Sequence, residues 1–175
     1  GVLDPGYVNI GTGTATAITA PLEAPKPDEK LRVSCCCHVV PGRWEYELGI
    51  LTTGAALKWF VENFAAALSG EPLSRLDEMA SRVKPGCNGL LFYPHLAGRL
   101  AAVSTGAKGV FIGITLDHGR EHFVRAVMEG VALQYPLMFE ILADLGVKVE
   151  VVRMVGGETE SKVWNQIKAD VLAKP

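Results

Sequence analysis

The amino-acid sequence predicts an α/β fold in which helices pack on a mixed β-sheet. Short β-type runs separated by turn residues fill the first 51 residues, and helical periodicity begins only after Gly54. The order of elements is therefore a β-rich segment, then helix, then β–α–β–α, which is typical of a layered α/β domain. A length of 175 residues is enough for one domain with a substantial core.

The β-rich segment contains four expected strands. The first two flank Gly11-Thr12-Gly13-Thr14, and the last two flank the turn signal Pro41-Gly42-Arg43. Between the two pairs, residues 20–30 are rich in proline and charge, which indicates a solvated loop. The expected strands are residues 7–10, 15–19, 31–40 and 45–51.

Apolar residues at helical spacing predict the helices. Residues 55–68 form the first, and a shorter one is expected at 73–83. A long helix is expected at 120–145, kinked at Pro136 and capped by Gly146. The apolar stripe of the first helix consists of Leu57, Phe60, Phe64 and Leu68.

Apolar and β-branched runs predict three further strands, at 90–93, 110–114 and 147–155. Gly156-Gly157 follows the last strand at once, and a helix is expected from Ser161. Paired glycines let the backbone approach a ligand that a Cβ would repel, and the free N–H groups of a helix N-terminus suit a phosphate. This segment therefore predicts a nucleotide or another phosphorylated ligand, with a plain tight turn as the alternative.

Two other glycine turns resemble this one in chemistry. Gly11-Thr12-Gly13-Thr14 links two strands, and Thr52-Thr53-Gly54 precedes a helix. Both offer backbone N–H groups and hydroxyls to phosphate oxygens. Neither fits the phosphate loop G-x-x-x-x-G-K-[ST] or a dinucleotide fingerprint, which argues against a Rossmann-type dehydrogenase. Three unrelated turns remain the simpler alternative.

Composition excludes several function classes. The formal net charge is −2 with no basic block, so nucleic acid is not an expected partner. No uncharged apolar run reaches the roughly 18 residues of a membrane span. The chain has no signal peptide and no initiator methionine, and it begins close to the turn Asp4-Pro5-Gly6, so we expect an excised or fragmentary chain.

Three of the four cysteines are consecutive and precede His38. In a strand over 31–40, Cys35 and Cys37 point to one face while Cys36 and His38 point to the other, so these residues cannot surround one metal ion. We expect buried strand cysteines and no metal site. Such thiols fit a reducing, cytoplasmic location.

The motifs together resemble the C-terminal domain of the FGGY carbohydrate kinases, and within them the xylulokinase-like branch. The most specific match is Gly109-Val110-Phe111-Ile112-Gly113-Ile114 and, after seven intervening residues, His122-Phe123-Val124-Arg125-Ala126-Val127-Met128-Glu129. This pattern is similar to the second signature of the family position by position. Supporting matches cover essentially the whole chain in the order of the family, at residues 9–13, 37–44, 53–59 and 156–175.

The resemblance implies an actin-like, ribonuclease-H-like ATPase domain over residues 1–175, which binds ATP with Mg²⁺ while a missing N-terminal domain binds most of the sugar. It implies that Thr12 and Gly13 face the terminal phosphates. Gly54 and Lys58 would meet the phosphates and the ribose side. The remaining implied ATP-binding residues are Gly156, Gly157, Glu158 and Lys162, of which the last three line the adenosine pocket.

Departures from the family pattern limit what the resemblance implies. Both catalytic carboxylates of the family belong to segments outside these residues, so no catalytic residue is expected in this chain, and alone it should be inactive. The final helix of the family is also absent. Most members carry P-Y-L-x-G-E-R-x-P where this chain has Pro94-His95-Leu96-Ala97-Gly98-Arg99-Leu100-Ala101, without the glutamate.

Several other side chains have a chemical and a structural interpretation. His95 and His118 are candidates for acid–base groups, but caps or surface positions are the simpler interpretation. Glu129 among apolar neighbours indicates a structural hydrogen bond to a nearby loop rather than catalysis. The three tryptophans are candidates for stacking on adenine, although Trp59 beside the apolar stripe favours core packing.

The leading hypothesis is phosphorylation of a sugar or polyol hydroxyl by ATP, most simply a ketose such as xylulose. The alternative is a non-catalytic nucleotide-binding relative on the same fold, in which the altered 95–101 loop reflects lost activity. The sequence leaves the identity of the sugar open. It also leaves the oligomeric state open, with a homodimer possible.

Overall fold

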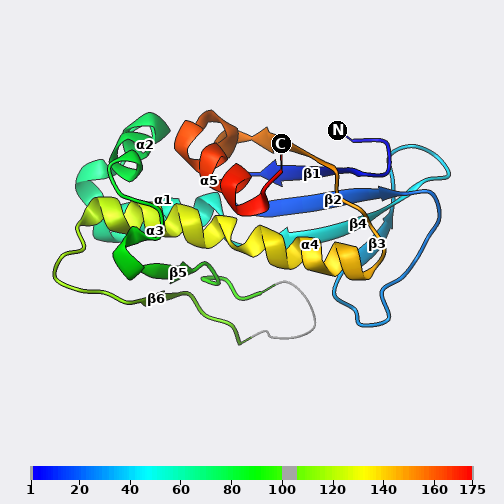
Figure 1. Ribbon diagram of the computed structural model, residues 1–175, viewed down its shortest axis with the longest axis horizontal. Helices are drawn as coiled ribbons and strands as arrows, with labels where there is room; N and C mark the ends of the chain where they lie inside the picture. Colours follow the sequence, from blue (N-terminus) through cyan, green and yellow to red (C-terminus); the bar gives the residue numbers. More distant parts are fainter. Residues whose placement is uncertain (1, 100–105, 175) are drawn as a thin grey trace.

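A five-stranded mixed sheet forms one layer of the fold, and a row of helices crosses one of its faces (Figure 1). The computed structural model describes residues 2–99 and 106–174. The strands are β1 (Tyr7–Thr12), β2 (Thr16–Leu22), β3 (Ser34–Cys37), β4 (Trp44–Ile50), β5 (Leu91–Tyr93), β6 (Val110–Ile112) and β7 (Val151–Gly156). The helices are α1 (Gly54–Phe64), α2 (Leu73–Ser81), α3 (Arg120–Ala132), α4 (Gln134–Asp144) and α5 (Lys162–Leu172), with short 3₁₀ turns at Ala66–Leu68, Cys87–Gly89 and Gly157–Glu160.

The register of the sheet decides which loops become neighbours. The strand order is β3-β4-β2-β1-β7, with β1 and β7 parallel and the other pairs antiparallel. Thr12 at the end of β1 pairs with Thr16 of β2 on one side and with Gly156 of β7 on the other. Thr16 in turn pairs with Ile50 at the end of β4. All three glycine turns therefore lie at one end of the sheet.

The long predicted helix is present, but it is divided into α3 and α4 around Leu133 (Figure 1). Pro136 has no N–H to donate to the carbonyl of Ala132, and its ring collides with that turn, so the helix breaks just before the proline. The C-terminal end follows the sequence prediction, because Gly146 has a φ of +87°. The amides of Gly146 and Val147 donate to the carbonyls of Ala143 and Leu142, each at 2.9 Å, which completes a Schellman cap.

Two apolar cores meet along this helical row. α4 packs on the sheet through Tyr135, Met138 and Leu142, against Ile10 and Ile18. α3 lies in a second core formed with α1, α2, α5 and the β5–β6 hairpin. The stretch Arg120–Asp144 is long and apolar enough for a membrane span by composition, yet 56% of its most apolar window is buried, as in a central core helix.

The predicted strand at 31–40 is wrong in extent, since β3 covers only Ser34–Cys37. β3 pairs with β4 alone and forms the edge of the sheet. The expectation of buried strand cysteines is therefore also wrong: Cys35 and Cys36 are half-buried and Cys37 is exposed, because an edge strand is covered on one side only. Cys87, by contrast, is buried, and burial next to Glu129 raises the pKa of its thiol to about 12.

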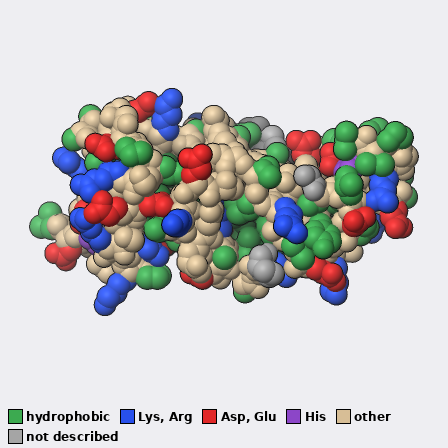
Figure 2. Space-filling view, turned by 90° about the horizontal axis from the view of Figure 1, so that it is seen from above, with side chains coloured by type: hydrophobic (Ala, Val, Ile, Leu, Met, Phe, Trp, Pro, Cys, Tyr) green, Lys and Arg blue, Asp and Glu red, His purple; other side chains and the backbone are tan. Residues whose placement is uncertain are grey.

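The surface carries both signs of charge. Figure 2 shows Lys and Arg side chains interspersed with Asp and Glu over the face seen from above, with apolar side chains between them. This mixture agrees with the formal net charge of −2.

Glu129 has the structural role that the sequence indicated. Its carboxylate accepts hydrogen bonds from Arg125 Nε at 2.6 Å and from the amide of Gly86 at 3.1 Å, and the Cys87 thiol donates to it at 3.5 Å. Arg125 also donates to the carbonyl of Ala80. This network connects α3 to the end of α2 and to the turn that precedes β5.

We expect Glu129→Gln to lower the free energy of unfolding by about 3 kcal/mol, because it leaves the buried guanidinium of Arg125 without a counter-charge. Glu78 is a matched control: it also pairs with two arginines, Arg75 and Arg82, but at the surface. Glu78→Gln should cost less than about 1 kcal/mol. Urea denaturation measures both, and equal losses would show that the Glu129 network adds nothing beyond a surface ion pair.

Candidate functional site

A cleft of about 820 Å³ opens where the three glycine turns meet. Its first side consists of backbone-rich and polar residues at the sheet end, and its second side is mostly apolar and belongs to α1, α2 and the loop between them. The first side is lined by Gly13, Thr14, Gly54, Gly157 and Glu158. The second is lined by Leu57, Trp59, Val61, Leu68, Leu73 and Leu76, with Lys58 and Glu62 on the same helix face and Trp164 of α5.

The turn between β1 and β2 holds the start of α1. The carbonyl of Gly13 accepts from Gly54 N at 3.0 Å, and the carbonyl of Thr14 accepts from the amides of Thr53 and Ala55, each at 3.1 Å. A Cβ on Gly54 would lie 2.5 Å from the carbonyl oxygen of Gly13, so only glycine permits this contact. Gly54 therefore lines the cleft, but its amide is already used and is not free for a phosphate.

The threonine hydroxyls of these turns are used within the fold. Thr12, only 8% exposed, donates to the carbonyl of Val155 at 3.0 Å. Thr53 donates to the carbonyl of Gly13 at 3.2 Å, and Thr52 donates to the carbonyl of Pro94. Each of these hydroxyls thus satisfies a neighbouring backbone carbonyl in this structure, and the assignment of Thr12 to ATP binding stays a prediction. Thr12 holds β1 against β7 and does not line the cleft.

The two glycines after β7 have different roles. Gly156 has a φ of +109°, and a Cβ there would collide with the carbonyl oxygen of Thr12. Gly157 has neither constraint: its φ is not positive, and a Cβ would meet no atom of the described residues within 4 Å. The fold therefore requires glycine at 156, whereas Gly157 faces open space in the cleft.

The N-terminus of α5 is not the expected anion site. The 3₁₀ turn Gly157–Glu160 separates the glycine pair from the helix. Ser161 caps the helix by accepting from Trp164 N at 2.9 Å. Asp77 of α2 accepts from the Ser161 hydroxyl and from Val163 N, so a carboxylate already occupies this positive end. A phosphate would have to bind at the glycine turns instead.

Beneath the cleft wall lies a buried ion pair that the sequence analysis did not predict. Lys168 of α5 is 1% exposed, Glu158 is 5% exposed, and Lys168 Nζ lies 2.7 Å from Glu158 Oε2. The same ammonium lies 4.6 Å from the ring centroid of Trp164. Burial lowers the pKa of Lys168, while the Glu158 carboxylate raises it. The sequence held one signal for this pair: Lys168 lies on the same face of the expected helix as Trp164 and Ile167, which are both buried in the structure.

The two lysines implied by the resemblance lie in different places. Lys58 lines the cleft with a side chain that is 75% exposed, 3.8 Å from Glu62 one helical turn later. Lys162 is the exposed first residue of α5 and does not line the cleft. Among the tryptophans, Trp59 and Trp164 line the cleft, but Trp164 Nε1 donates to the carbonyl of Met128 and anchors α5 to α3.

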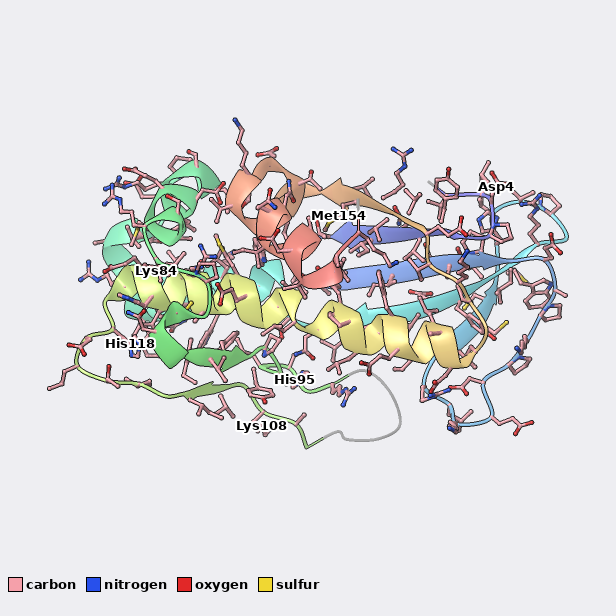
Figure 3. The ribbon with its side chains drawn as sticks, viewed as in Figure 1. Asp4, Lys84, His95, Lys108, His118 and Met154 are labelled. Carbon is pink, nitrogen blue, oxygen red and sulfur yellow. The ribbon has the colours of Figure 1, made fainter. Side chains whose placement is uncertain are left out.

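The histidines lie elsewhere. Figure 3 shows His118 before the start of α3 and His95 after β5. Nδ1 of His118 accepts from the amide of Thr115 at 2.9 Å, which is a turn cap, as the sequence indicated. Burial lowers the pKa of His95, and the nearby charge of Arg99 lowers it further. Of the altered 94–101 segment, residues 100 and 101 lie outside the described residues.

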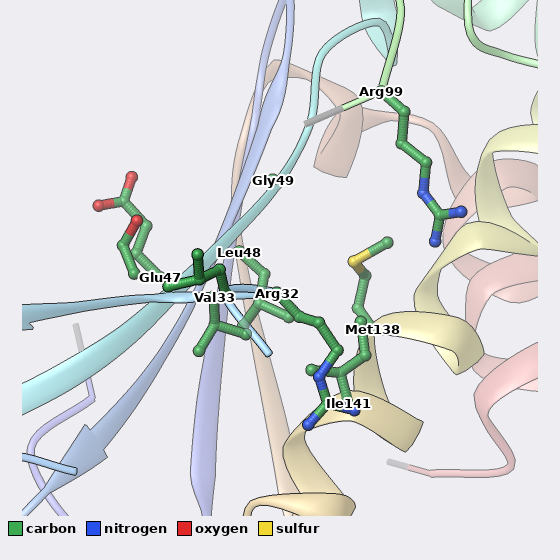
Figure 4. Close-up of a pocket in the computed structure, with 10 residues that line it drawn as sticks. Arg32, Val33, Glu47, Leu48, Gly49, Arg99, Met138 and Ile141 are labelled. Atoms are coloured by element: carbon green, nitrogen blue, oxygen red, sulfur yellow. The ribbon is translucent and has the colours of Figure 1, made fainter. Parts of the chain in front are cut away.

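A second cavity, of about 440 Å³, lies between the β3–β4 edge and α4 (Figure 4). Arg32, Arg99 and Met138 are among its lining residues. The Arg32 guanidinium is already paired with Asp28 and Asp144. No residue implied by the sequence to bind ATP lines this cavity, so the cleft at the glycine turns is the candidate site.

The arrangement of the cleft suits a ligand with an anionic end and a flat apolar end. Backbone groups of closely spaced turns can surround phosphate oxygens, and the leucines and Trp59 provide a surface for a ring. Among the described residues, no hydrogen bond uses the amide of Gly13 or Thr14 as donor. These amides, with Gly157, are the donors that the geometry leaves for an anion.

Comparisons with known proteins identify similar sequences and structures. The sequence of residues 6–175 matches the family described as the FGGY family of carbohydrate kinases, C-terminal domain. Gluconokinase of Bacillus subtilis is 32% identical to this chain, and the match covers 95% of this chain and 34% of the gluconokinase. Xylulose kinase of the same organism is 31% identical, and that match covers 98% of this chain and 34% of the xylulose kinase. The crystal structure of xylulose kinase from Rhodospirillum rubrum superposes with a TM-score of 0.88 at 32% identity, over 99% of this chain and 35% of that one.

The chain thus spans about a third of the length of the curated relatives that it matches. The resemblance found in the sequence is confirmed at the level of the family. The predicted α/β architecture, a mixed sheet flanked by helices, is confirmed as well.

The different constraints on the glycine pair predict different effects on stability. Gly156→Ala should lower the free energy of unfolding by about 3 kcal/mol or more, from backbone strain and the collision with Thr12. Gly157→Ala should change it by less than about 0.5 kcal/mol, because the new methyl group enters open space. Urea denaturation distinguishes the two variants. A large loss for Gly157→Ala would mean that this position is constrained by the fold.

Proposed function

The chain belongs to the FGGY family of carbohydrate kinases, matching its C-terminal domain over residues 6–175, and on this basis we propose that it supplies the ATP-binding half of a sugar kinase. The fold is that of the actin-like ATPases. The proposed reaction transfers the γ-phosphoryl group of ATP to a hydroxyl of a sugar or polyol. The observation that carries the proposal is the cleft at the glycine turns, with backbone groups at one side and apolar residues at the other.

The phosphate end of ATP is assigned to the sheet side of the cleft. Gly13 and Thr14 would direct their amides at the terminal phosphates, and Gly157 would allow the closest approach of the backbone. Phosphoryl transfer depends mainly on positioning and on electrostatic stabilisation of the phosphoryl oxygens, for which fixed backbone dipoles are suited. Gly54 and Gly156 support this arrangement indirectly, because they allow the turns to pack together.

The adenosine end is assigned to the side formed by α1 and α2. Trp59 and the leucines provide an apolar surface, and Lys58 lies on the same helix face where its ammonium can reach a phosphate or the ribose. Lys162 is exposed on α5 and does not line the cleft, so we assign it no direct contact with the nucleotide. Mg²⁺ would enter with ATP and neutralise phosphate charge.

The sugar and its general base are assigned to a separate N-terminal domain, with residues 1–175 as the C-terminal domain. A ketose such as xylulose is the proposed substrate. Gluconate is the alternative substrate, because the gluconokinase and the xylulose kinase of Bacillus subtilis are similar to this chain at nearly the same identity. Four cysteines without a disulfide among the described residues are consistent with a reducing, cytoplasmic location.

The proposal predicts that the 175-residue chain binds ATP but does not phosphorylate sugars. Isothermal titration with Mg–ATP measures binding, and a coupled assay of ADP release with xylulose, gluconate and glycerol measures turnover. Binding without sugar-dependent turnover is the expected result. A folded chain that binds no ATP would contradict the proposed site, and sugar-dependent turnover would contradict the assignment of the general base to another domain.

Gly157→Val tests the position of the nucleotide. The fold leaves room for this side chain, but the proposed phosphate approach does not, so the Kd for ATP should rise roughly tenfold or more. Gly106 is a matched control, because a Cβ there also meets no atom within 4 Å among the residues that the structure describes, and Gly106 does not line the cleft. Gly106→Val should leave the Kd for ATP unchanged. Equal affinities of the two folded variants would show that Gly157 does not approach the nucleotide.

A further inference from the structure

Thr53 occupies the N-cap position of α1, but its hydroxyl does not cap the helix. A threonine at this position normally accepts a hydrogen bond from an amide in the first turn of the helix. Here the carbonyls of Gly13 and Thr14, in the β1–β2 turn, accept from the first amides of α1 instead. The Thr53 hydroxyl is therefore available for another role, although the residue is 0% exposed.

This hydroxyl belongs to a short relay that ends on the β1–β2 turn. Thr16 of β2 donates to the Thr53 hydroxyl at 3.0 Å, and Thr53 donates to the carbonyl of Gly13 at 3.2 Å. Both threonine side chains are buried, so water does not compete for these hydrogen bonds. The same carbonyl accepts from Gly54 N at 3.0 Å. Two donors at the start of α1 thus converge on one carbonyl oxygen.

The carbonyl of Gly13 and the amide of Thr14 belong to the same peptide unit. The described part of the chain has no cis peptide bond, so this amide points opposite to the carbonyl, away from the start of α1. Thr14 is exposed and lines the cleft, and its amide donates to no residue that the structure describes. The peptide therefore presents a donor on the exposed side of the turn, while buried hydrogen bonds hold its acceptor.

The Thr53 hydroxyl is not needed to satisfy the Gly13 carbonyl, because that oxygen already accepts from the amide of Gly54. Packing does not require the hydroxyl either, since valine has nearly the same shape as threonine. The second donor has a different effect. Hydrogen bonds in series polarise one another, so a donor on a carbonyl makes the N–H of the same peptide a stronger donor. It also fixes the plane of the peptide, which lowers the ordering cost of binding.

We propose that Thr53 is a positioning residue of the phosphate site. Its buried hydroxyl holds and polarises the peptide between Gly13 and Thr14, and the amide of that peptide donates to a terminal phosphate oxygen of ATP. Thr53 itself does not line the cleft and touches no phosphate. This inference rests on the proposed ATP site and adds a residue that strengthens one of its backbone donors.

The test measures the Kd for Mg–ATP and for AMP by isothermal titration. AMP lacks the terminal phosphates, so only ATP should report the loss of the hydroxyl. Thr53→Val should raise the Kd for ATP about fivefold and the Kd for AMP less than about twofold. Thr53→Ser keeps the hydroxyl and should bind ATP as tightly as the unchanged protein.

An NMR measurement tests the polarisation without any ligand. The amide nitrogen resonance of Thr14 should move upfield in Thr53→Val, because the preceding carbonyl loses a donor. It should move in the same direction, but less, in Thr16→Val, which removes only the donor to Thr53. Circular dichroism checks that each variant is folded, and Thr16→Val carries the test if Thr53→Val does not fold. An unchanged Thr14 resonance in the folded valine variants would overturn the inference.

Thr52→Val is the matched control. It removes a neighbouring buried hydroxyl that donates to the carbonyl of Pro94, so the Kd for ATP should stay within about twofold. If folded Thr53→Val binds ATP as tightly as the unchanged protein, or loses affinity for ATP and AMP equally, the inference is wrong and the hydroxyl is structural. If the folded, unchanged protein binds no ATP, the proposed ATP site itself is wrong.

Discussion

The candidate site depends on the register of β1 with its two neighbours. Thr12 pairs with Thr16 on one side and with Gly156 on the other, so the β1–β2 turn and the glycine pair reach the same end of the sheet. The Thr12 hydroxyl reinforces this register through the carbonyl of Val155. A slip by one residue would turn every β1 side chain to the opposite face and separate the turns. The cleft is thus a consequence of strand pairing.

Much of this architecture could be predicted from the sequence, because it follows from local patterns. Apolar periodicity gave the helices, and Pro136 explained where the long helix divides. The three glycine turns could be selected as phosphate-binding candidates from their backbone amides and hydroxyls. The resemblance to the family then implied that they belong to one nucleotide site. Five implied ligand residues line the cleft: Gly13, Gly54, Lys58, Gly157 and Glu158.

What could not be predicted depends on contacts between distant residues. Thr12 was expected to offer its hydroxyl to a phosphate, but the partner that takes it, Val155, is 143 positions away in the chain. Gly54 was expected to offer its amide, which Gly13 accepts instead. Lys168 looked like an ordinary helix residue, because only the position of Glu158 shows why a lysine is buried there. The exposure of the cysteines on the edge strand could likewise be predicted only with knowledge of the strand order.

The most direct test of the account is an NMR titration of glycine-labelled protein with Mg–ATP. The account places the nucleotide at the sheet end, so the amide resonances of Gly13, Gly54 and Gly157 should move together with a single affinity. Gly49 lines the other cavity, beside Arg99, and its resonance should stay in place. Movement of Gly49 without movement of the three cleft glycines would contradict the account.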